Sequence, residues 1–369
     1  MKKVIAFIAQ ETVLTVAWIL AIISMFFFHP STDYIEYIDV KSLGILWSLM
    51  VIMAGLKETG FFDKIGEKLL KRAKTGHQLA LILIFLCFFS SMFITNDVAL
   101  ITFVPFAIFM LDACDREDLL IPVITFQTIA ANLGSMLTPI GNPQNLYLYG
   151  LSGMSIDDFI ALMLPYSALT AVLLLISSFL LKDRKHPLKV RLNPHSFNKR
   201  QSVVYGILFL IALLVVCRLI PFYYLVYAVL AVVFFMDKKI LIEIDYALLF
   251  TFVGFFIFTG NLGRLPSVVA VLTNLVNGHE VLAGVLSSQF ISNVPAALLL
   301  SGFTENLKGL IIGVNFGGLG TLIASMASLI SFKSLAHAKN HIKGRYFIYF
   351  TIANVIYLAI LWGFYLILS

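Results

Sequence analysis

Charged residues are scarce in this chain of 369 residues, where they make up 12% of the sequence against 60% for hydrophobic residues. Soluble domains carry about 25% charged residues, so the composition excludes a soluble globular protein. Apolar runs recur along the whole chain with only short polar stretches between them, which leaves no room for a separate soluble domain. We therefore predict one membrane domain over residues 1–369.

Motifs of catalytic and structural metal sites are also missing. The three cysteines, Cys87, Cys114 and Cys217, lie far apart without CxxC or Cys/His spacing, which argues against a disulfide framework and a structural zinc site. The apolar runs contain no HExxH or GxSxG motif and no paired metal-binding acids. We expect no enzymatic activity, and no cofactor other than sodium or a proton as a coupling ion.

Runs of about 16 to 25 apolar residues have the length of a membrane crossing. The sequence predicts nine crossings, near residues 4–28, 43–57, 119–149, 157–181, 202–217, 222–236, 245–261, 307–336 and 346–368. The first run has no small-residue cleavage site after it, so it is expected to remain as a helix and not to be removed as a signal peptide. Two other apolar stretches, 78–112 and 279–303, are broken in the middle by polar residues. We predict that each is a hairpin that enters and leaves the membrane on one side.

Most basic residues fall on one side of this topology. The loops assigned to the cytoplasm hold Lys2, Lys3, Lys57, Lys64, Lys68, Lys71, Arg72, Lys74, Arg116, Lys182, Arg184, Lys185, Lys189, Arg191, Lys199, Arg200, Lys238, Lys239, Lys333, Lys339, Lys343 and Arg345. Only Lys41, Arg218, Arg264 and Lys308 fall outside. By the positive-inside rule the N-terminus is predicted to lie in the cytoplasm and the C-terminus outside. The protein is expected in a prokaryotic cytoplasmic (inner) membrane. Basic residues confined to such loops indicate contact with lipid and no nucleic-acid partner.

Between a crossing and a hairpin, each half of the chain has a short amphipathic stretch, at 61–72 and at 264–276. Both are predicted to lie flat at the membrane interface. The alternative for the first stretch is a solvated cytoplasmic helix.

Two blocks of sequence occur in both halves in the same order. FITN at 93–96 corresponds to FISN at 290–293, and NLGSMLT at 132–138 corresponds to NFGGLGT at 315–321. We infer two structural repeats, at about 4–181 and about 222–369, joined by a linking helix at about 202–217. Because one extra crossing separates the repeats, they are predicted to be inverted, so that the hairpin tips at 95–97 and 292–294 meet near the membrane midplane.

The crossing 119–149 is interrupted by TPIGNPQN at 138–145, where proline removes backbone donors and glycine permits an open backbone. Its counterpart at 321–328 keeps small polar residues without proline or asparagine, so we expect the second half of the site to be less open. The predicted fold is an all-α polytopic membrane protein with inverted structural repeats, two re-entrant helical hairpins and two broken transmembrane helices.

Polar hairpin tips and helix breaks are tolerated in a membrane only against protein or a wet cavity, where open backbone groups can bind ions. Asp97 is the strongest single indication of a binding site. Placing a carboxylate at this depth costs much free energy unless it binds a cation, carries a proton or accepts several hydrogen bonds. The alternatives are that the tips only cap helices and that Gly313, Gly317, Gly318 and Gly320 only permit close packing. The predicted substrate and ion site consists of Thr95, Asn96, Asp97, Thr138, Pro139, Gly141, Asn142, Asn145, Ser292, Asn293, Val294, Thr321, Ala324 and Ser325, with Asn132 and Asn315 as secondary candidates.

The segments FITNDVAL, FISNVPAAL and ANLGSMLTPIGNPQNL together resemble the ion transporter superfamily. That group holds divalent anion sodium symporters, arsenite permeases, citrate–metal permeases and NhaD-type sodium/proton antiporters. The resemblance extends over nearly the whole chain from about residue 11. It implies an elevator motion within a homodimer, and sodium sites near Thr95, Asn96 and Gly141 and near Ser292, Asn293 and Ala324. Asp97 and Val294 stand where the dicarboxylate symporters have hydroxyl residues, and the Asn-Asp tip with GNPQN is more similar to the arsenite permease branch.

From the residues and the resemblance we expect a secondary active transporter of a small anion or oxyanion, either carboxylate, sulfate-like or arsenite-like. Sodium or protons are expected to drive it through alternating access, with Asp97 in the coupling site. The main rival is a sodium/proton antiporter in which Asp97 alternates between a proton and a cation. An anion channel is a further alternative, which saturable transport that depends on a second ion would exclude.

Overall fold

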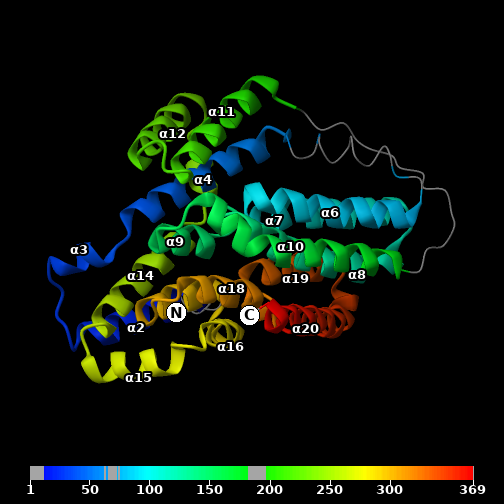
Figure 1. Ribbon diagram of the computed structural model, residues 1–369. Coiled ribbons are helices and arrows are strands. Elements are labelled where there is room, and N and C mark those ends of the chain that lie inside the picture. Colours follow the sequence, from blue (N-terminus) through cyan, green and yellow to red (C-terminus); the bar gives the residue numbers. More distant parts are fainter. Residues whose placement is uncertain (1–11, 62–63, 65–72, 74, 182–196, 369) are drawn as a thin grey trace.

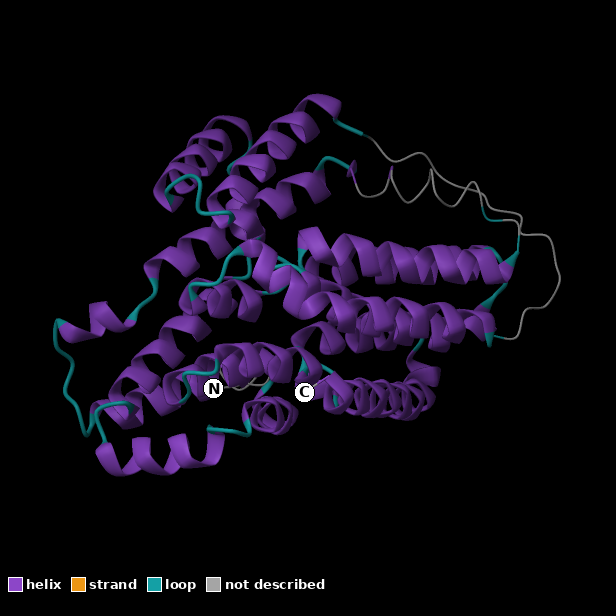
Figure 2. Cartoon of the chain, viewed as in Figure 1, coloured by secondary structure: helices purple, strands orange, loops and turns teal. Residues whose placement is uncertain are grey.

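The computed structural model describes residues 12–61, 64, 73, 75–181 and 197–368, and every regular element in these ranges is a helix (Figures 1 and 2). The first half contains α2 (Thr12–Met25), α3 (Asp33–Tyr37), α4 (Val40–Glu58), α6 (Gly76–Ile94), α7 (Asn96–Ala113), α8 (Leu120–Gly134), α9 (Pro143–Ser152) and α10 (Ile156–Phe179). The second contains α11 (Lys199–Val216), α12 (Phe222–Met236), α13 (Ile240–Glu243), α14 (Tyr246–Leu262), α15 (Pro266–Val276), α16 (Glu280–Ile291), α17 (Asn293–Leu300), α18 (Leu307–Gly317), α19 (Met326–Ala338) and α20 (Lys343–Leu368).

Six described helical segments are long and apolar enough to cross a membrane alone, namely Val40–Glu58, Gly76–Ile94, Glu117–Leu137, Ile156–Phe179, Lys199–Val216 and Asn340–Leu368. The predicted crossings near 222–236 and 245–261 form shorter apolar helices, and the crossing near 307–336 is divided between α18 and α19. The segment Gly76–Ile94 is the first arm of a predicted hairpin, yet it has the length of a full span. Length and composition alone therefore do not separate a hairpin arm from a crossing.

The first predicted hairpin is formed by α6 and α7. The chain reverses at Thr95, which has a φ of 66°, and the two helices pack against each other and against α8. Gln127 on α8 donates from Nε2 to Leu83 O on α6, at 3.1 Å, and to Phe103 O on α7, at 3.4 Å. Because a single amide reaches both arms, the arms lie side by side, and the chain reversal at Thr95 makes them antiparallel.

The second hairpin is formed by α16 and α17 and reverses at Ser292, with a φ of 72°. Its base is closed by Glu280 at the start of α16. The Glu280 carboxylate accepts hydrogen bonds from Thr304 Oγ1 at 3.1 Å and Asn306 Nδ2 at 3.2 Å, just beyond the returning arm. Both hairpins thus turn at a non-glycine residue with a positive φ, an uncommon conformation, at corresponding positions of the sequence repeat.

The helices α4 and α14 begin in the same way. Asp39 accepts from Ser42 N and Asp245 accepts from Leu248 N, each at 3.0 Å, which satisfies a free N–H group of the first turn. Each aspartate follows an isoleucine, so Ile38-Asp39 and Ile244-Asp245 are a third pair of repeated positions. The sequence comparison missed this pair because only two residues match.

The two halves interlock through their first helices. A helix near the start of each half packs on a helix of the other half: α2 packs on α14, and α12 packs on α4. The linking helix α11 also packs on α4, so that α4, α11 and α12 lie together in the upper part of Figure 1, while α2 and α14 lie in its lower part. Of the two amphipathic stretches, the second forms α15, from which α16 bends away by 109°. The first stretch, 61–72, lies outside the described residues except for Phe61 and Lys64.

Candidate functional site

Both predicted helix breaks are present. The first separates α8 and its 3-10 extension, Ser135–Leu137, from α9, and Asn142 caps α9 by accepting from Asn145 N at 2.9 Å. The second separates α18 from α19, with the 3-10 turn Leu322–Ala324 between them. Each break lies against the tip of the hairpin in its own half. Thr138 Oγ1 donates to Met92 O in the first half, and Thr321 Oγ1 donates to Gln289 O, at 3.3 Å, in the second.

The tip of the first hairpin is held by Asn96. Its backbone N donates to Gly141 O in the first break at 3.0 Å, and its Nδ2 donates to Asn132 Oδ1 at 3.1 Å. Its own Oδ1 accepts from Asp97 N at 2.9 Å. Thr95 Oγ1 accepts from Val98 N at 3.5 Å, so the alternative that tip residues cap helices is correct for this side chain. Asn96 nevertheless binds groups outside its own hairpin, which a simple cap does not do.

Two asparagines join the breaks of the two halves reciprocally. Asn132 Oδ1 accepts from Ser325 Oγ at 3.0 Å, and its Nδ2 donates to Ser328 Oγ at 3.3 Å. Asn315 Oδ1 accepts from Asn142 Nδ2 at 3.1 Å, and its Nδ2 donates to Asn145 Oδ1 at 2.7 Å.

Asn132 and Asn315 are repeated positions, and Ser325 and Ser328 correspond to Asn142 and Asn145 in the same alignment. Each half thus uses the same asparagine to bind the same two positions of the other half. The secondary candidates Asn132 and Asn315 are therefore the centre of the polar network. All of these groups are buried, where an unmade hydrogen bond costs about 1–3 kcal/mol.

The network also brings the two hairpin tips to one place. Asn132 Nδ2 donates to Gly318 O at 3.3 Å, and a Cβ added at Gly318 would lie 3.0 Å from Asn293 Nδ2. The path from Asn96 through Asn132 and Gly318 therefore ends at Asn293. Of the remaining predicted residues, Pro139, Ser292, Val294 and Ala324 are buried beside the breaks and the second tip.

Glycines allow the first part of each broken helix to approach its hairpin. A Cβ added at Gly134 would lie 2.3 Å from Phe88 O and 2.6 Å from Ser91 Oγ. A Cβ added at Gly317 would lie 2.4 Å from Ser288 Oγ. Gly134 and Gly317 are repeated positions, as are Ser91 and Ser288. For Gly317 the packing alternative is therefore correct.

A cavity of about 170 Å³ leads from the surface to the first hairpin tip. Its wall is formed by Leu46, Met50, Met53, Ala54, Lys57, Thr95, Asp97, Val98, Ile101, Pro143, Ile244, Asp245, Leu248, Met326 and Ile330. Lys57 and Asp245 are exposed, whereas Thr95 and Asp97 are half-buried. Lys57 and Asp245 therefore lie at the mouth of the cavity. Asp97 Oδ1 is buried and has no hydrogen-bond partner among the described residues. A carboxylate that accepts no hydrogen bond at Oδ1 from the described residues therefore lines a cavity that solutes can enter.

Several residues of this site escaped the sequence analysis. Gln289 donates from Nε2 to Gly317 O and Leu319 O and accepts from Thr321 N, which fixes the second break against its hairpin. In the sequence, the only indication of this role is that Gln289 is a polar residue three positions before the tip. Lys57 was assigned to a cytoplasmic loop and Asp245 to a helix end, and only the packing of α4 beside α14 brings both to one mouth.

The sequence matches the model of a known transporter family. The family described as CitMHS: Citrate transporter matches residues 4–308, which is most of the chain. The chain belongs to this citrate transporter family.

Two prokaryotic proteins are similar to the chain over most of their length. Uncharacterized transporter MJ0456 of Methanocaldococcus jannaschii is 34% identical over 306 residues, covering 82% of each chain. Inner membrane protein YbiR of Escherichia coli is 32% identical over 324 residues, covering 85% of this chain and 86% of the relative. Silicon efflux transporter LSI3 of rice is 31% identical over a shorter stretch, 41% of this chain and 31% of the relative. The protein is thus a multi-pass membrane protein of a transporter family, which confirms the superfamily resemblance.

Proposed function

We propose that the protein is a secondary active transporter that moves a small anion or oxyanion by alternating access, coupled to sodium or protons. The observation that carries the proposal is the cavity that runs from the exposed Lys57 and Asp245 to the tip residues Thr95 and Asp97. A solute can enter it from one side, and the chain belongs to a family of transporters.

The charge of Asp97 gives a reason for coupling. An anion in the cavity would be repelled by the Asp97 carboxylate, and repulsion between charges is strong where water is largely excluded. A sodium ion or a proton on Asp97 removes that repulsion. We therefore propose that the cation binds first and that the solute follows, which couples the movement of the two.

Inverted repeats would allow a second state of the transporter, in which the site faces the other side of the membrane. The proposal places the tips of the two hairpins near the midplane, with their bases on opposite sides of the membrane, the N-terminus in the cytoplasm and the C-terminus outside. The reciprocal bonds of Asn132 and Asn315 support a shared site, because they tie the broken helices of both halves together. Such a site between two similar halves can face either side in turn.

The solute is proposed to be small and of low charge. Most of the cavity wall is apolar, and Lys57 at the mouth is the basic side chain that lines it. The family description names citrate and one relative is a silicon efflux transporter, so carboxylates and oxyanions are the first solutes to test.

A sodium/proton antiporter is the second candidate, because two aspartates, Asp97 and Asp245, line the same cavity. In that case Asp97 exchanges a proton for a cation and no anion is carried. A pH-sensitive dye inside proteoliposomes separates the two candidates: sodium-driven proton movement without any added anion indicates antiport.

Uptake of radiolabelled carboxylates and oxyanions into proteoliposomes tests the main proposal. A sodium or proton gradient should drive saturable uptake by the wild-type protein, and Asn96→Ala and Asn293→Ala should each reduce it at least about fivefold, the lower end of typical coupling between sites. Asn274→Ala is the matched control, because Asn274 is exposed on α15 and should be dispensable. Wild-type uptake rates in both tip variants would refute the proposed site.

A further inference from the structure

Three aromatic side chains pack together between α9 and α14, beside the second hairpin. Tyr147 on α9 packs against Phe252 and Phe256 on α14, with ring centroids 6.5 Å and 5.5 Å away, and the two phenylalanine rings are 6.0 Å apart. The Tyr147 hydroxyl and Ser301 Oγ are 3.0 Å apart and share a hydrogen bond. All three rings are buried, at 9% exposure or less. We call this group, Tyr147, Phe252 and Phe256, the aromatic cluster.

The members of the aromatic cluster correspond to residues that line the open cavity. When Asp39 and Asp245 are aligned as the caps of α4 and α14, Leu46 and Met50 correspond to Phe252 and Phe256. When the breaks are aligned on Thr138 and Thr321, Ile330 corresponds to Tyr147. Leu46, Met50 and Ile330 all line the cavity. Each set takes residues from both halves. The three positions therefore line an open cavity beside the first hairpin and are filled by aromatic rings beside the second.

The helices around these positions differ in the same way. In the second half, α14 packs directly against the hairpin arm α17. In the first half, the equivalent α4 and α7 face each other across the cavity, with Met50 and Met53 on one wall and Val98 and Ile101 on the other. Because the two halves share the repeated sequence blocks, we infer that the two packings are alternatives that each repeat can adopt.

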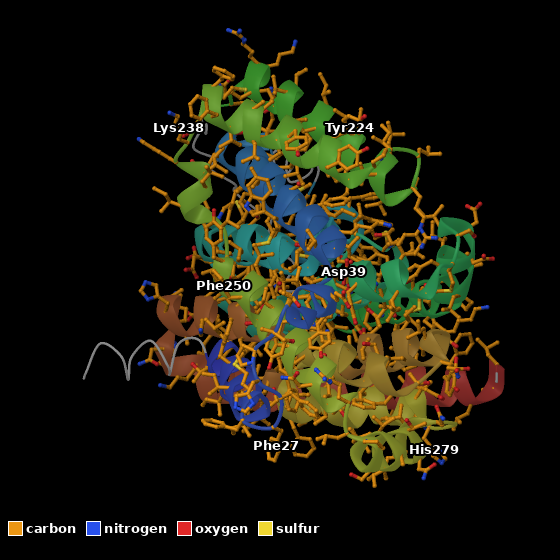
Figure 3. All side chains as sticks on the ribbon, turned by 90° about the vertical axis from the view of Figure 1, so that its left-hand side faces the viewer. Phe27, Asp39, Tyr224, Lys238, Phe250 and His279 are labelled. Atoms are coloured by element: carbon orange, nitrogen blue, oxygen red, sulfur yellow. The ribbon has the colours of Figure 1, made fainter. Side chains whose placement is uncertain are left out.

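We propose that the aromatic cluster is the gate that closes the shared site to the opposite side of the membrane. When it opens, α14 separates from α17, and a cavity forms at the second hairpin tip while α4 closes on α7. Its mouth is then near Asp39, which is labelled in Figure 3 and is the counterpart of Asp245 at the mouth of the present cavity. This inference rests on the proposed transport function and names the residues that gate it. The Tyr147 hydrogen bond to Ser301 and the ring contacts hold the gate shut.

Cysteine labelling in purified, detergent-solubilised protein tests the gate without any solute. The native cysteines are replaced, and one reporter is introduced: Ile101→Cys in the open cavity, or Leu298→Cys at the corresponding position of the second hairpin, where Leu298 is 1% exposed. The reference protein should react with maleimide at position 101 and much more slowly at position 298. Adding Tyr147→Ala should raise the rate at position 298 about tenfold and lower it at position 101, because opening one side closes the other.

Tyr166→Ala is the matched control. Tyr166 is also a buried tyrosine between two aromatic rings, those of Phe316 and Phe364, and it lies outside the aromatic cluster. It should leave the ratio of the two rates unchanged. If Tyr147→Ala does not fold, Tyr147→Phe and Ser301→Ala remove only the hydroxyl contact. Each should raise the rate at position 298 and lower the rate at position 101, by a smaller factor than that expected for Tyr147→Ala.

The labelling pattern decides the outcome. Opposite changes at positions 101 and 298 support the gate, whereas a rise at both positions indicates general loosening and overturns it, as does no change at position 298. Because no solute is present, failed anion uptake with opposite labelling changes would refute the proposed substrate and leave the gate intact. Gradient-driven uptake by the wild-type protein, together with labelling rates that do not change in opposite directions, would show that the aromatic cluster is not the gate.

Discussion

Replacing Asp97 by asparagine is expected to reduce ion-driven uptake by about 10- to 100-fold, the range expected for loss of a strong coupling between sites. Asparagine has the same shape as aspartate but cannot carry a proton or balance the charge of a bound cation. Because Asp97 Oδ1 has no partner among the described residues, the substitution should not destabilise the fold. Uptake under a sodium gradient and under a proton gradient, with the melting temperature of the purified variant, measures both effects.

Asp112→Asn is the control for this substitution, because Asp112 lies near the other end of α7. There it forms an ion pair with Lys339 at 3.2 Å, and this hydrogen bond raises the pKa of Lys339. The pair is partly exposed, so its loss should cost little stability. Asp112→Asn should retain wild-type uptake. If Asp97→Asn also retained wild-type uptake with the same ion dependence, Asp97 would not be the coupling residue.

Gly134→Ala and Gly317→Ala are each expected to lower the free energy of unfolding by about 1–3 kcal/mol, the usual cost of overpacking a core. The added methyl group would overlap Phe88 O and Ser91 Oγ in the first half and Ser288 Oγ in the second. Neither hairpin can move away freely, because Gln127 and Gln289 tie the hairpins to the broken helices. Thermal unfolding of the purified protein in detergent should show a lower melting temperature for both variants.

Gly206→Ala provides the comparison. Gly206 lies inside α11, and a Cβ added there meets no atom within 4 Å. Alanine is the better helix former, so this variant should be as stable as the wild type or slightly more stable. Equal melting temperatures for all three variants would contradict the close approach of hairpin and broken helix.

The features that the sequence predicted correctly all interrupt an apolar run. The hairpin turns at Thr95 and Ser292 and the break before Pro143 stand out because polar residues, glycine and proline are rare in such runs and force the helix to end. The matching of Asn132 with Asn315 followed from repeated letters. Local chemistry was sufficient for these features because each one depends on a few consecutive residues.

Features that depend on packing between distant segments were not predictable in this way. The sequence did not show that Asn132 binds Ser325 and Ser328, or that Lys57 and Asp245 share one mouth. The aromatic cluster joins Tyr147 to two phenylalanines more than 100 residues away, in an apolar run where aromatic residues are common. Burial, orientation and register decide these contacts, and a single sequence carries little information on them.

The inverted arrangement of the two hairpins can be tested by finding the side of the membrane on which each hairpin base lies. A membrane-impermeant maleimide is applied to inside-out and right-side-out vesicles that carry Gln78→Cys or His279→Cys in a background without other cysteines. Gln78 lies at the base of the first hairpin and His279, labelled in Figure 3, at the base of the second; both are exposed. If the two hairpins enter from opposite sides, Gln78→Cys reacts only from the cytoplasmic side and His279→Cys only from the outside. Reaction of both from the same side would show that the hairpins are not inverted.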